Sequence, residues 1–341
     1  MQPNILILGG GYAGTIAAAR IARRGIPVTL VDQRDALVER IRLHQVAAGD
    51  DIPPVPYQQI FRNLPVDVVR ARVTSIDRAT KRVTTSAGVL TYDKLVYALG
   101  SESGENPLVI RQRLQTARTV TVIGGGLTGI ETAAEIAERH PHVAVTLVDR
   151  GTIGAGLSAR AIKHLHSFFD AHNVKVVENR AVAPGEQLDA DLVIRCTSFE
   201  LSPIAWDAGL RTNERGQVIV DDHLRSTDPS IYVVGDAAYV PGRRMSCALA
   251  LPMGAYVADL LTGATREPFR FGFALQCISL GRHDGIVQFV TPEDEPRDGA
   301  ILGRPAAWVK ELICRFTVLS LKMETRGVHY RWPRPEEEAA A

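Results

Sequence analysis

The sequence has little of several features that mark particular protein classes. Only four cysteines occur among 341 residues, at positions 196, 247, 277 and 314, so the chain has no C-x-x-C or C-x4-C pair. This spacing excludes a close-spaced dithiol or zinc motif and favours free thiols in a reducing compartment. We therefore expect no metal site and a cytoplasmic location.

An excess of charge of one sign is also lacking. The chain carries 39 basic and 38 acidic residues, and aromatic residues make up only 6%. Such a balance gives no electrostatic reason to expect a nucleic-acid partner. No run approaches the ~18 apolar residues of a membrane span, and no basic leader precedes the first apolar run. At most, we expect peripheral contact with a membrane.

The chain does contain the same glycine turn twice. "ILILGGGYAG" at 5–14 returns as "VTVIGGGLTG" at 120–129. In each copy an apolar run typical of a buried strand precedes the glycines, and a helical pattern and a second apolar run follow them. The sequence therefore predicts an α/β fold with two Rossmann-like units, because the repeat period is too long for a solenoid.

The first turn has the spacing of a dinucleotide site. Gly9 permits the tight turn, Gly11 leaves room for a pyrophosphate, and Gly14 allows close packing of helix on strand. Phosphates would then meet the free N–H groups at the helix start. Asp32 ends the second strand, where a carboxylate accepts hydrogen bonds from ribose hydroxyls.

The second turn repeats this chemistry with Gly124, Gly126 and Gly129. Asp149 follows at the ribose position, and a carboxylate there favours NADH over NADPH. The adjacent Arg150 could offset that preference, so NADPH stays open. Two such sites in one chain imply a nicotinamide hydride donor and a flavin acceptor.

The remaining segments are read from their hydropathy patterns. Residues 66–101 alternate apolar and polar residues, which predicts antiparallel strands with turns at "DRATK" and "SAGV". A C-terminal region from about residue 269 begins with strands and ends in a helix around 306–323. That helix shows an apolar stripe flanked by Lys310, Arg315 and Lys322. It could rest on a membrane, on its own domain or on a second subunit of a homodimer.

The order of motifs resembles the pyridine nucleotide–disulfide oxidoreductase superfamily, the flavoproteins with two dinucleotide-binding domains. Besides the two glycine motifs, "TYDKLVYALGS" at 91–101 is similar to the crossover of that family, and "IYVVGDAA" at 231–238 is similar to its second FAD motif. The four motifs cover most of residues 1–260. Within the superfamily the chain looks like the type II NADH dehydrogenase branch.

The resemblance implies three regions: an FAD domain of residues 1–105 and 216–265, an inserted NAD(P)H domain of residues 116–215, and a C-terminal α+β region of residues 266–341. The implied FAD contacts are Gly9, Gly11, Tyr12, Ala13, Gly14, Asp32, Gln33, Arg42, His44, Gln45, Val73, Ala98, Leu99, Gly100, Gly235, Asp236, Pro252, Met253 and Gly254. The implied NAD(P)H contacts are Gly124, Gly126, Leu127, Thr128, Gly129, Glu131, Asp149, Arg150 and Ser198.

Two departures from the family bear on the reaction. No cysteine lies in residues 33–60, where the disulfide reductases carry their redox pair. Type II dehydrogenases that reduce quinone carry A-Q-x-x-x-Q after the second FAD motif, and here Ala255, Tyr256 and Leu260 stand at the three positions. Dithiol chemistry at the usual place is therefore excluded, and quinone reduction is placed in doubt.

The function predicted from these observations is hydride transfer from NAD(P)H to flavin N5 and onward to an unidentified acceptor: a quinone, a small molecule, a carrier protein or oxygen. Hydride transfer needs alignment rather than a general base, so His44 is the sole acid–base candidate and the catalytic residues stay unknown. In two alternatives the flavin oxidises a small organic substrate, or the protein is a flavin-containing redox sensor. The stretch "CALALPMGAYVADLL" at 247–261 follows the Asp236 motif, where the family begins a helix that points at the flavin. The alternative is an ordinary amphipathic helix with Pro252 in its first turn.

Overall fold

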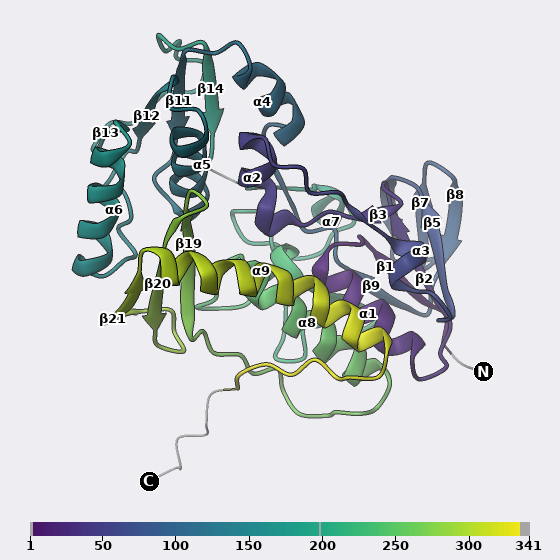
Figure 1. Cartoon of the computed structure of the whole chain (residues 1–341). Helices are drawn as coiled ribbons and strands as arrows, with labels where there is room; N and C mark the ends of the chain where they lie inside the picture. The colour runs from purple at the N-terminus through teal and green to yellow at the C-terminus, as the bar shows by residue number, and fades with distance from the viewer. Residues whose placement is uncertain (1–2, 198, 335–341) are drawn as a thin grey trace.

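Two parallel sheets form the framework of the protein (Figure 1). The computed structural model describes residues 3–197 and 199–334. The first sheet has the strand order β17-β9-β1-β2-β5, and all neighbouring strands are parallel. Its strands are β1 (Ile5–Leu8), β2 (Val28–Asp32), β5 (Val66–Arg70), β9 (Lys94–Tyr97) and β17 (Ile231–Val233).

The second sheet repeats this arrangement with four parallel strands in the order β13-β12-β11-β14. Its strands are β11 (Thr119–Ile123), β12 (Ala144–Val148), β13 (Lys175–Val177) and β14 (Leu192–Arg195). The helix α1 (Tyr12–Ala22) follows the first glycine turn, and α5 (Leu127–Arg139) follows the second. The α/β fold class with two Rossmann-like units is confirmed.

The prediction of antiparallel strands across residues 66–101 was partly wrong. β6 (Val73–Asp77), β7 (Arg82–Thr85) and β8 (Gly88–Thr91) do form an antiparallel sheet with turns at the predicted places. The flanking strands β5 and β9 instead belong to the first parallel sheet. β5 lies at the edge of the sheet and stays partly exposed, so its apolar and polar residues alternate as they commonly do in antiparallel sheets.

Shorter elements connect these sheets. The helical ones are η1 (Arg40–Arg42), α2 (Leu43–Ala48), α3 (Tyr57–Ile60), α4 (Pro107–Leu114), α6 (Ala159–Ala171), α7 (Ile204–Asp207) and η2 (Gly235–Ala237). The short strands are β3 (Ala36–Leu37), β4 (Val55–Pro56), β10 (Ser101–Ser103), β15 (Phe199–Leu201), β16 (Val218–Ile219) and β18 (Ala238–Tyr239). α2 leaves the first unit and packs against α5 of the second, as Figure 1 shows.

The helix α8 (Cys247–Leu261) packs along α1. It is buried from Leu249 to Ala258, so it lacks the exposed polar face of an amphipathic helix. Pro252 is its sixth residue rather than part of its first turn. A Cβ at Gly254 would lie 2.1 Å from the carbonyl oxygen of Ala13, so only glycine allows this close approach of the two helices.

The C-terminal region is a three-stranded antiparallel sheet followed by one long helix. The sheet consists of β19 (Leu275–Leu280), β20 (Asp284–Val290) and β21 (Pro296–Leu302), and α9 (Arg304–Thr325) runs from it across to α1 (Figure 1). Glu324, near the end of α9, accepts two hydrogen bonds from the buried Arg20 of α1, at 3.0 and 2.7 Å. α9 therefore connects the second unit to the first.

Candidate functional site

The two glycine turns have nearly the same geometry. Gly9 and Gly124 take φ values of +98° and +111°, which favour glycine. A Cβ at Gly14 would lie 1.9 Å from the carbonyl oxygen of Gly9, and a Cβ at Gly129 would lie 1.8 Å from that of Gly124. Each turn therefore requires glycine at its first and third positions for backbone conformation and packing.

The aspartate that follows each second strand accepts a hydrogen bond from the second of the three consecutive glycines in its turn, Gly10 or Gly125. Asp32 accepts a hydrogen bond from the N–H of Gly10 at 2.7 Å, and Asp149 accepts one from the N–H of Gly125 at 2.6 Å. The sequence predicted these carboxylates to bind ribose. It gave no sign that they also fix the turns, since Gly10 and Gly125 lie outside the G-x-G-x-x-G positions.

The start of each helix has the properties of a phosphate site. Gly11 and Gly126 are the N-cap residues of α1 and α5, and neither provides a side-chain hydrogen bond to the helix. A Cβ at either glycine would meet no atom within 4 Å, so both face open space. Unbonded N–H groups, the positive end of the helix dipole and room for a ligand fit a dinucleotide pyrophosphate.

The crossover motif and the second predicted FAD motif meet beside the first turn. Ser101 donates a hydrogen bond from Oγ to Asp236 at 2.7 Å. A Cβ at Gly9 would lie 2.3 Å from the carbonyl oxygen of Ala98, which shows how closely the crossover approaches the turn. The structure thus brings residues from three distant sequence segments to one end of the first sheet.

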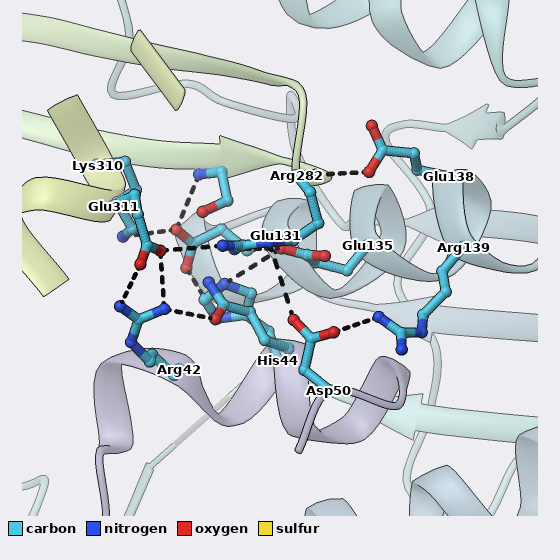
Figure 2. Close-up of polar contacts among 12 residues, drawn as sticks. Arg42, His44, Asp50, Glu131, Glu135, Glu138, Arg139, Arg282, Lys310 and Glu311 are labelled. Carbon is cyan, nitrogen blue, oxygen red and sulfur yellow. Dashed lines mark hydrogen bonds and ion pairs between the residues drawn. The ribbon is translucent and has the colours of Figure 1, made fainter. Parts of the chain in front are cut away.

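Three of the predicted FAD contacts lie in a polar cluster between α2, α5 and α9 (Figure 2). Arg42 donates two hydrogen bonds to Glu311 of α9, both at 2.9 Å, and one to Gln45 at 3.0 Å. His44 is buried, with Nδ1 3.6 Å from Oε2 of Glu131. Arg42 is thus engaged within the chain, whereas Nε2 of His44 and Nε2 of Gln45 are buried without a hydrogen-bond partner. The roles of all three as FAD contacts stay predictions.

Glu131 is the centre of this cluster. The amino group of Lys310 lies 2.8 Å from its Oε1, and the N–H of Ser279 in β19 donates to the same atom at 3.0 Å. Burial raises the pKa of Glu131 and is the largest single effect. The charge of Lys310, the neighbouring His44 and the hydrogen bonds from Lys310 and the Ser279 N–H together outweigh it and hold the pKa below its usual range. Glu131 is therefore ionised.

Glu135 lies one turn further along α5, and its surroundings favour the protonated, neutral carboxyl. Its side chain is 2% exposed, and its Oε1 lies 3.8 Å from Nε2 of His44 and 3.7 Å from Nη1 of Arg282. Burial raises the pKa of Glu135 to about 8, and the charge of Arg282 offsets this only in part. Burial also lowers the pKa of His44 to about 4, so that ring is neutral.

Sequence reasoning missed Lys310, Glu135 and Arg282. Lys310 was expected to flank the apolar stripe of α9, yet it is buried and paired with Glu131. The buried face of α9 carries polar residues such as Lys310, Thr317 and Glu324, whereas several regularly spaced apolar residues lie on its exposed face. Apolar periodicity therefore points to the wrong face of this helix. Glu135 follows Glu131 by four residues, which places both carboxylates on one face of α5 and was the available signal.

The other predicted contacts are spread along the two units. Gln33 and Arg150 are exposed, Val73 is buried at the start of β6, and Ser198 lies outside the described residues. Leu127 and Thr128 begin α5 directly after the second turn. No helix in the described part of the chain is both long and apolar enough to cross a membrane.

Comparison with known proteins agrees with this geometry. Residues 3–254 match the family described as pyridine nucleotide-disulphide oxidoreductase. Ferroptosis suppressor protein 1 of Xenopus tropicalis is 26% identical, over 88% of this chain and 90% of its own length. Type II NADH:quinone oxidoreductase of Staphylococcus saprophyticus is 27% identical, over 94% of this chain and 96% of its own length.

Solved structures show the same fold. NDH2 of Plasmodium falciparum in complex with NADH has a TM-score of 0.78 at 13% identity, covering 98% of this chain and 99% of its own. The sulfide:quinone oxidoreductase of Aquifex aeolicus has a TM-score of 0.78 at 18% identity, covering 94% and 92%. The fold and the two glycine turns are those of the flavoprotein oxidoreductases with two dinucleotide-binding units, and the chain is similar to the NADH dehydrogenase type among them. The chain belongs to the pyridine nucleotide-disulphide oxidoreductase family.

Proposed function

We propose that the protein is an FAD-dependent NADH oxidoreductase that delivers electrons to a quinone. The observation that carries the proposal is the pair of glycine turns, each with open space and free N–H groups at the start of its helix. In each turn an aspartate accepts a hydrogen bond from the N–H of Gly10 or Gly125. The name of the staphylococcal relative supports a quinone as the acceptor. The division into FAD, NAD(P)H and C-terminal regions at the predicted boundaries belongs to the same proposal.

In this proposal the first turn holds FAD. The free N–H groups after Gly11 bind the pyrophosphate, Asp32 binds ribose, and Asp236 binds the ribityl chain at the edge marked by Ser101. FAD, when bound, supplies a hydride acceptor that can pass electrons onward. Burial of α8 against α1 excludes water from that side of the first unit.

The second turn would admit NADH. Asp149 is fixed by the N–H groups of Gly125 and Gly151, at 2.6 and 2.7 Å, so its carboxylate is already oriented. A fixed negative charge at this point accepts bonds from the ribose hydroxyls of NADH and repels the 2′-phosphate of NADPH. NADH is therefore the proposed coenzyme, although Arg150 is adjacent and exposed.

The quinone would not use the positions where type II dehydrogenases carry glutamines. Ala255 and Tyr256 are buried, and the Tyr256 hydroxyl donates to the carbonyl oxygen of Glu267 at 2.7 Å. This side of α8 is therefore occupied by packing within the chain. The acceptor must approach by another face.

The outer face of α9 supports contact with a membrane, where lipid quinones dissolve. Trp308, Leu312 and Phe316 are 84%, 66% and 51% exposed and lie at intervals of four residues. Arg304, Arg315, Lys322 and Arg326 are also exposed on α9 or at its end. An apolar stripe with basic neighbours fits the interface of an anionic bilayer. A second copy of the chain is the competing occupant.

The test of the proposed function is a binding and acceptor assay on the purified protein. One equivalent of FAD should bind per chain, and NADH oxidation should depend on both FAD and a short-chain benzoquinone. NADPH should be the poorer donor. A protein that neither contains nor binds FAD would contradict the proposal.

A further inference from the structure

The second glycine turn rests against the loop that follows β12, residues 150–158. The N–H of Gly154 donates a hydrogen bond to the carbonyl oxygen of Gly125 at 3.1 Å. Ile153 is fully buried, and a Cβ at Gly125 would lie 2.6 Å from its side chain. The loop therefore packs directly on the turn, and the position of one is linked to that of the other.

The same loop holds the carboxylate proposed to bind the ribose of NADH. Oδ1 of Asp149 accepts a hydrogen bond from the N–H of Gly151 in the loop at 2.7 Å, and Oδ2 accepts one from Gly125 in the turn at 2.6 Å. The N–H of Ile153 donates to Glu178, just after β13, at 2.8 Å. A shift of the loop would therefore move both the turn and the carboxylate that meet the coenzyme.

The far end of this loop is bonded to the C-terminal region. The loop ends at Ser158, the N-cap of α6, and α6 packs against β20 and β21 (Figure 1). The side chain of Gln288 in β20 is fully buried, and its Oε1 accepts hydrogen bonds from the Oγ and the N–H of Ser158, at 2.6 and 3.2 Å. Gln288 thus connects the coenzyme loop to the C-terminal sheet.

The orientation of the Gln288 amide is fixed by its partners at both ends. Its Nε2 donates to the carbonyl oxygens of Phe289 and Gly299, at 3.0 and 3.1 Å, and to that of Arg297. Carbonyl oxygens accept only from the nitrogen of the amide, and the N–H of Ser158 donates only to its oxygen. A reversed amide would lose these bonds, so Gln288 holds the loop in one position.

The first glycine turn is supported by a different part of the chain. The hydroxyl of Tyr57 in α3 donates to the carbonyl oxygen of Gly10 at 2.7 Å. A Cβ at Gly10 would lie 2.1 Å from that hydroxyl, so Tyr57 packs on this turn as Ile153 packs on the second. Tyr57 belongs to the first unit, whereas Gln288 belongs to the C-terminal sheet. The two turns should therefore respond to different substitutions.

We propose that Gln288 is a positioning residue for NADH, which holds the loop 150–158, and through it the second turn, in the conformation that accepts the coenzyme. The inference rests on the proposed function, in which NADH binds at this turn. Gln288 acts through Ser158 and the loop. Affinity depends on this support because a turn that is already in its bound conformation loses less conformational entropy on binding.

The test uses Ser158→Ala in the FAD-loaded protein, because this variant removes one donor to Gln288 and keeps the buried amide. Anaerobic flavin bleaching at increasing NADH concentrations gives the dissociation constant of NADH and the limiting rate. The dissociation constant should rise by about fivefold, the effect of losing one typical hydrogen bond. The limiting rate should stay within about twofold. The affinity for FAD should be unchanged, and Ser158→Thr, which keeps the hydroxyl, should bind NADH as the wild type does.

Two further variants separate positioning from a general loss of structure. Ser158 also caps α6 through the N–H of Ala161, so Gln288→Met is needed to remove the acceptor while the cap remains. It should weaken NADH binding at least as much as Ser158→Ala. His164 of α6 lies 2.7 Å from Asp284 of β20, which makes His164→Ala a matched control that breaks another contact between the same elements. It should leave the affinity for NADH within about twofold.

Hydrogen exchange of the FAD-loaded protein reports on the loop without any coenzyme. The amide of Gly154, which is bonded to Gly125, should exchange about fivefold faster in Ser158→Ala than in the wild type. Tyr57→Phe should leave this exchange unchanged and should instead weaken the binding of FAD to the apoprotein.

Three results would overturn the inference: wild-type affinity for NADH in Ser158→Ala, an equal loss of affinity for FAD and NADH, or an equal effect of His164→Ala. If Gln288→Met does not fold, Ser158→Ala and Ser158→Thr decide the question. If NADH fails to bleach the wild-type flavin, the proposed function fails and the role of Gln288 with it. If bleaching is normal and the variants bind NADH normally, only the positioning role fails.

Discussion

Lys310 of α9 and Glu131 of α5 form a buried ion pair with 2.8 Å between the amino group and the carboxylate. The two residues are 179 positions apart in the chain, counted as 310 − 131. The pair joins the C-terminal helix to the helix of the second glycine turn. It therefore makes the C-terminal region part of the site.

Replacement of Lys310 by methionine should strongly destabilise the protein. The variant leaves the Glu131 charge buried with only the Ser279 N–H and the nearby neutral His44, and such changes cost about 3–5 kcal/mol. The free energy of unfolding in urea measures this loss. The exposed Lys322→Met on the same helix is the control, and adding Glu131→Gln should recover part of the stability. Equal stability of Lys310→Met and wild type would contradict the buried pair.

The two kinds of glycine in the first turn should respond differently to alanine. A Cβ at Gly14 would overlap the Gly9 carbonyl, so Gly14→Ala should lower the melting temperature of the apoprotein. A Cβ at Gly11 meets no protein atom, so Gly11→Ala should fold normally but bind FAD at least about 10-fold more weakly. Thermal melts and FAD titrations check both. Full FAD affinity in Gly11→Ala would argue against phosphate binding there.

Stability should fall with pH because of Glu135. Its folded pKa of about 8 lies above the unfolded value of 4.5, so the native state binds more protons between these values. The free energy of unfolding therefore decreases as the pH rises from 4.5 to 8, by up to about 1.4 kcal/mol per unit from this group. Glu135→Gln should remove that part of the slope. Parallel stability curves for the two proteins would show that Glu135 is ionised at neutral pH.

The outer face of α9 should bind anionic vesicles. Replacing Trp308, Leu312 and Phe316 with serine removes the apolar stripe and should abolish flotation with vesicles that contain phosphatidylglycerol. Serine at the same positions should leave the fold intact, because these side chains are exposed. Gel filtration distinguishes the competing explanation: a wild-type dimer that the triple variant dissociates, without any vesicle binding, would assign the stripe to self-association.

The two Rossmann-like units could be predicted from the sequence because each glycine turn is part of a short stretch with recognisable local patterns. The strand, the turn and the helix each have a residue pattern, and the acids at 32 and 149 follow at a fixed distance. The parallel pairing of β5 with β2 and of β9 with β1 could not be predicted, since partner strands are set by tertiary contacts.

The polar cluster was less predictable for a different reason. Its members come from α2, α5, β19 and α9, and no local pattern links His44 to Lys310 or Arg282. Buried charges are rare, so a lysine on a helix is first taken as exposed. Only the packing of α9 against β19 shows that Lys310 points inward.

The most direct test of the central claim is anaerobic stopped-flow mixing of the FAD-loaded protein with NADH. If NADH at the second turn passes a hydride to FAD at the first, the flavin absorbance should fall rapidly with NADH and more slowly with NADPH. In Asp149→Ala the rate with NADH should drop more than the rate with NADPH. An FAD-loaded protein whose absorbance neither coenzyme changes would contradict the account.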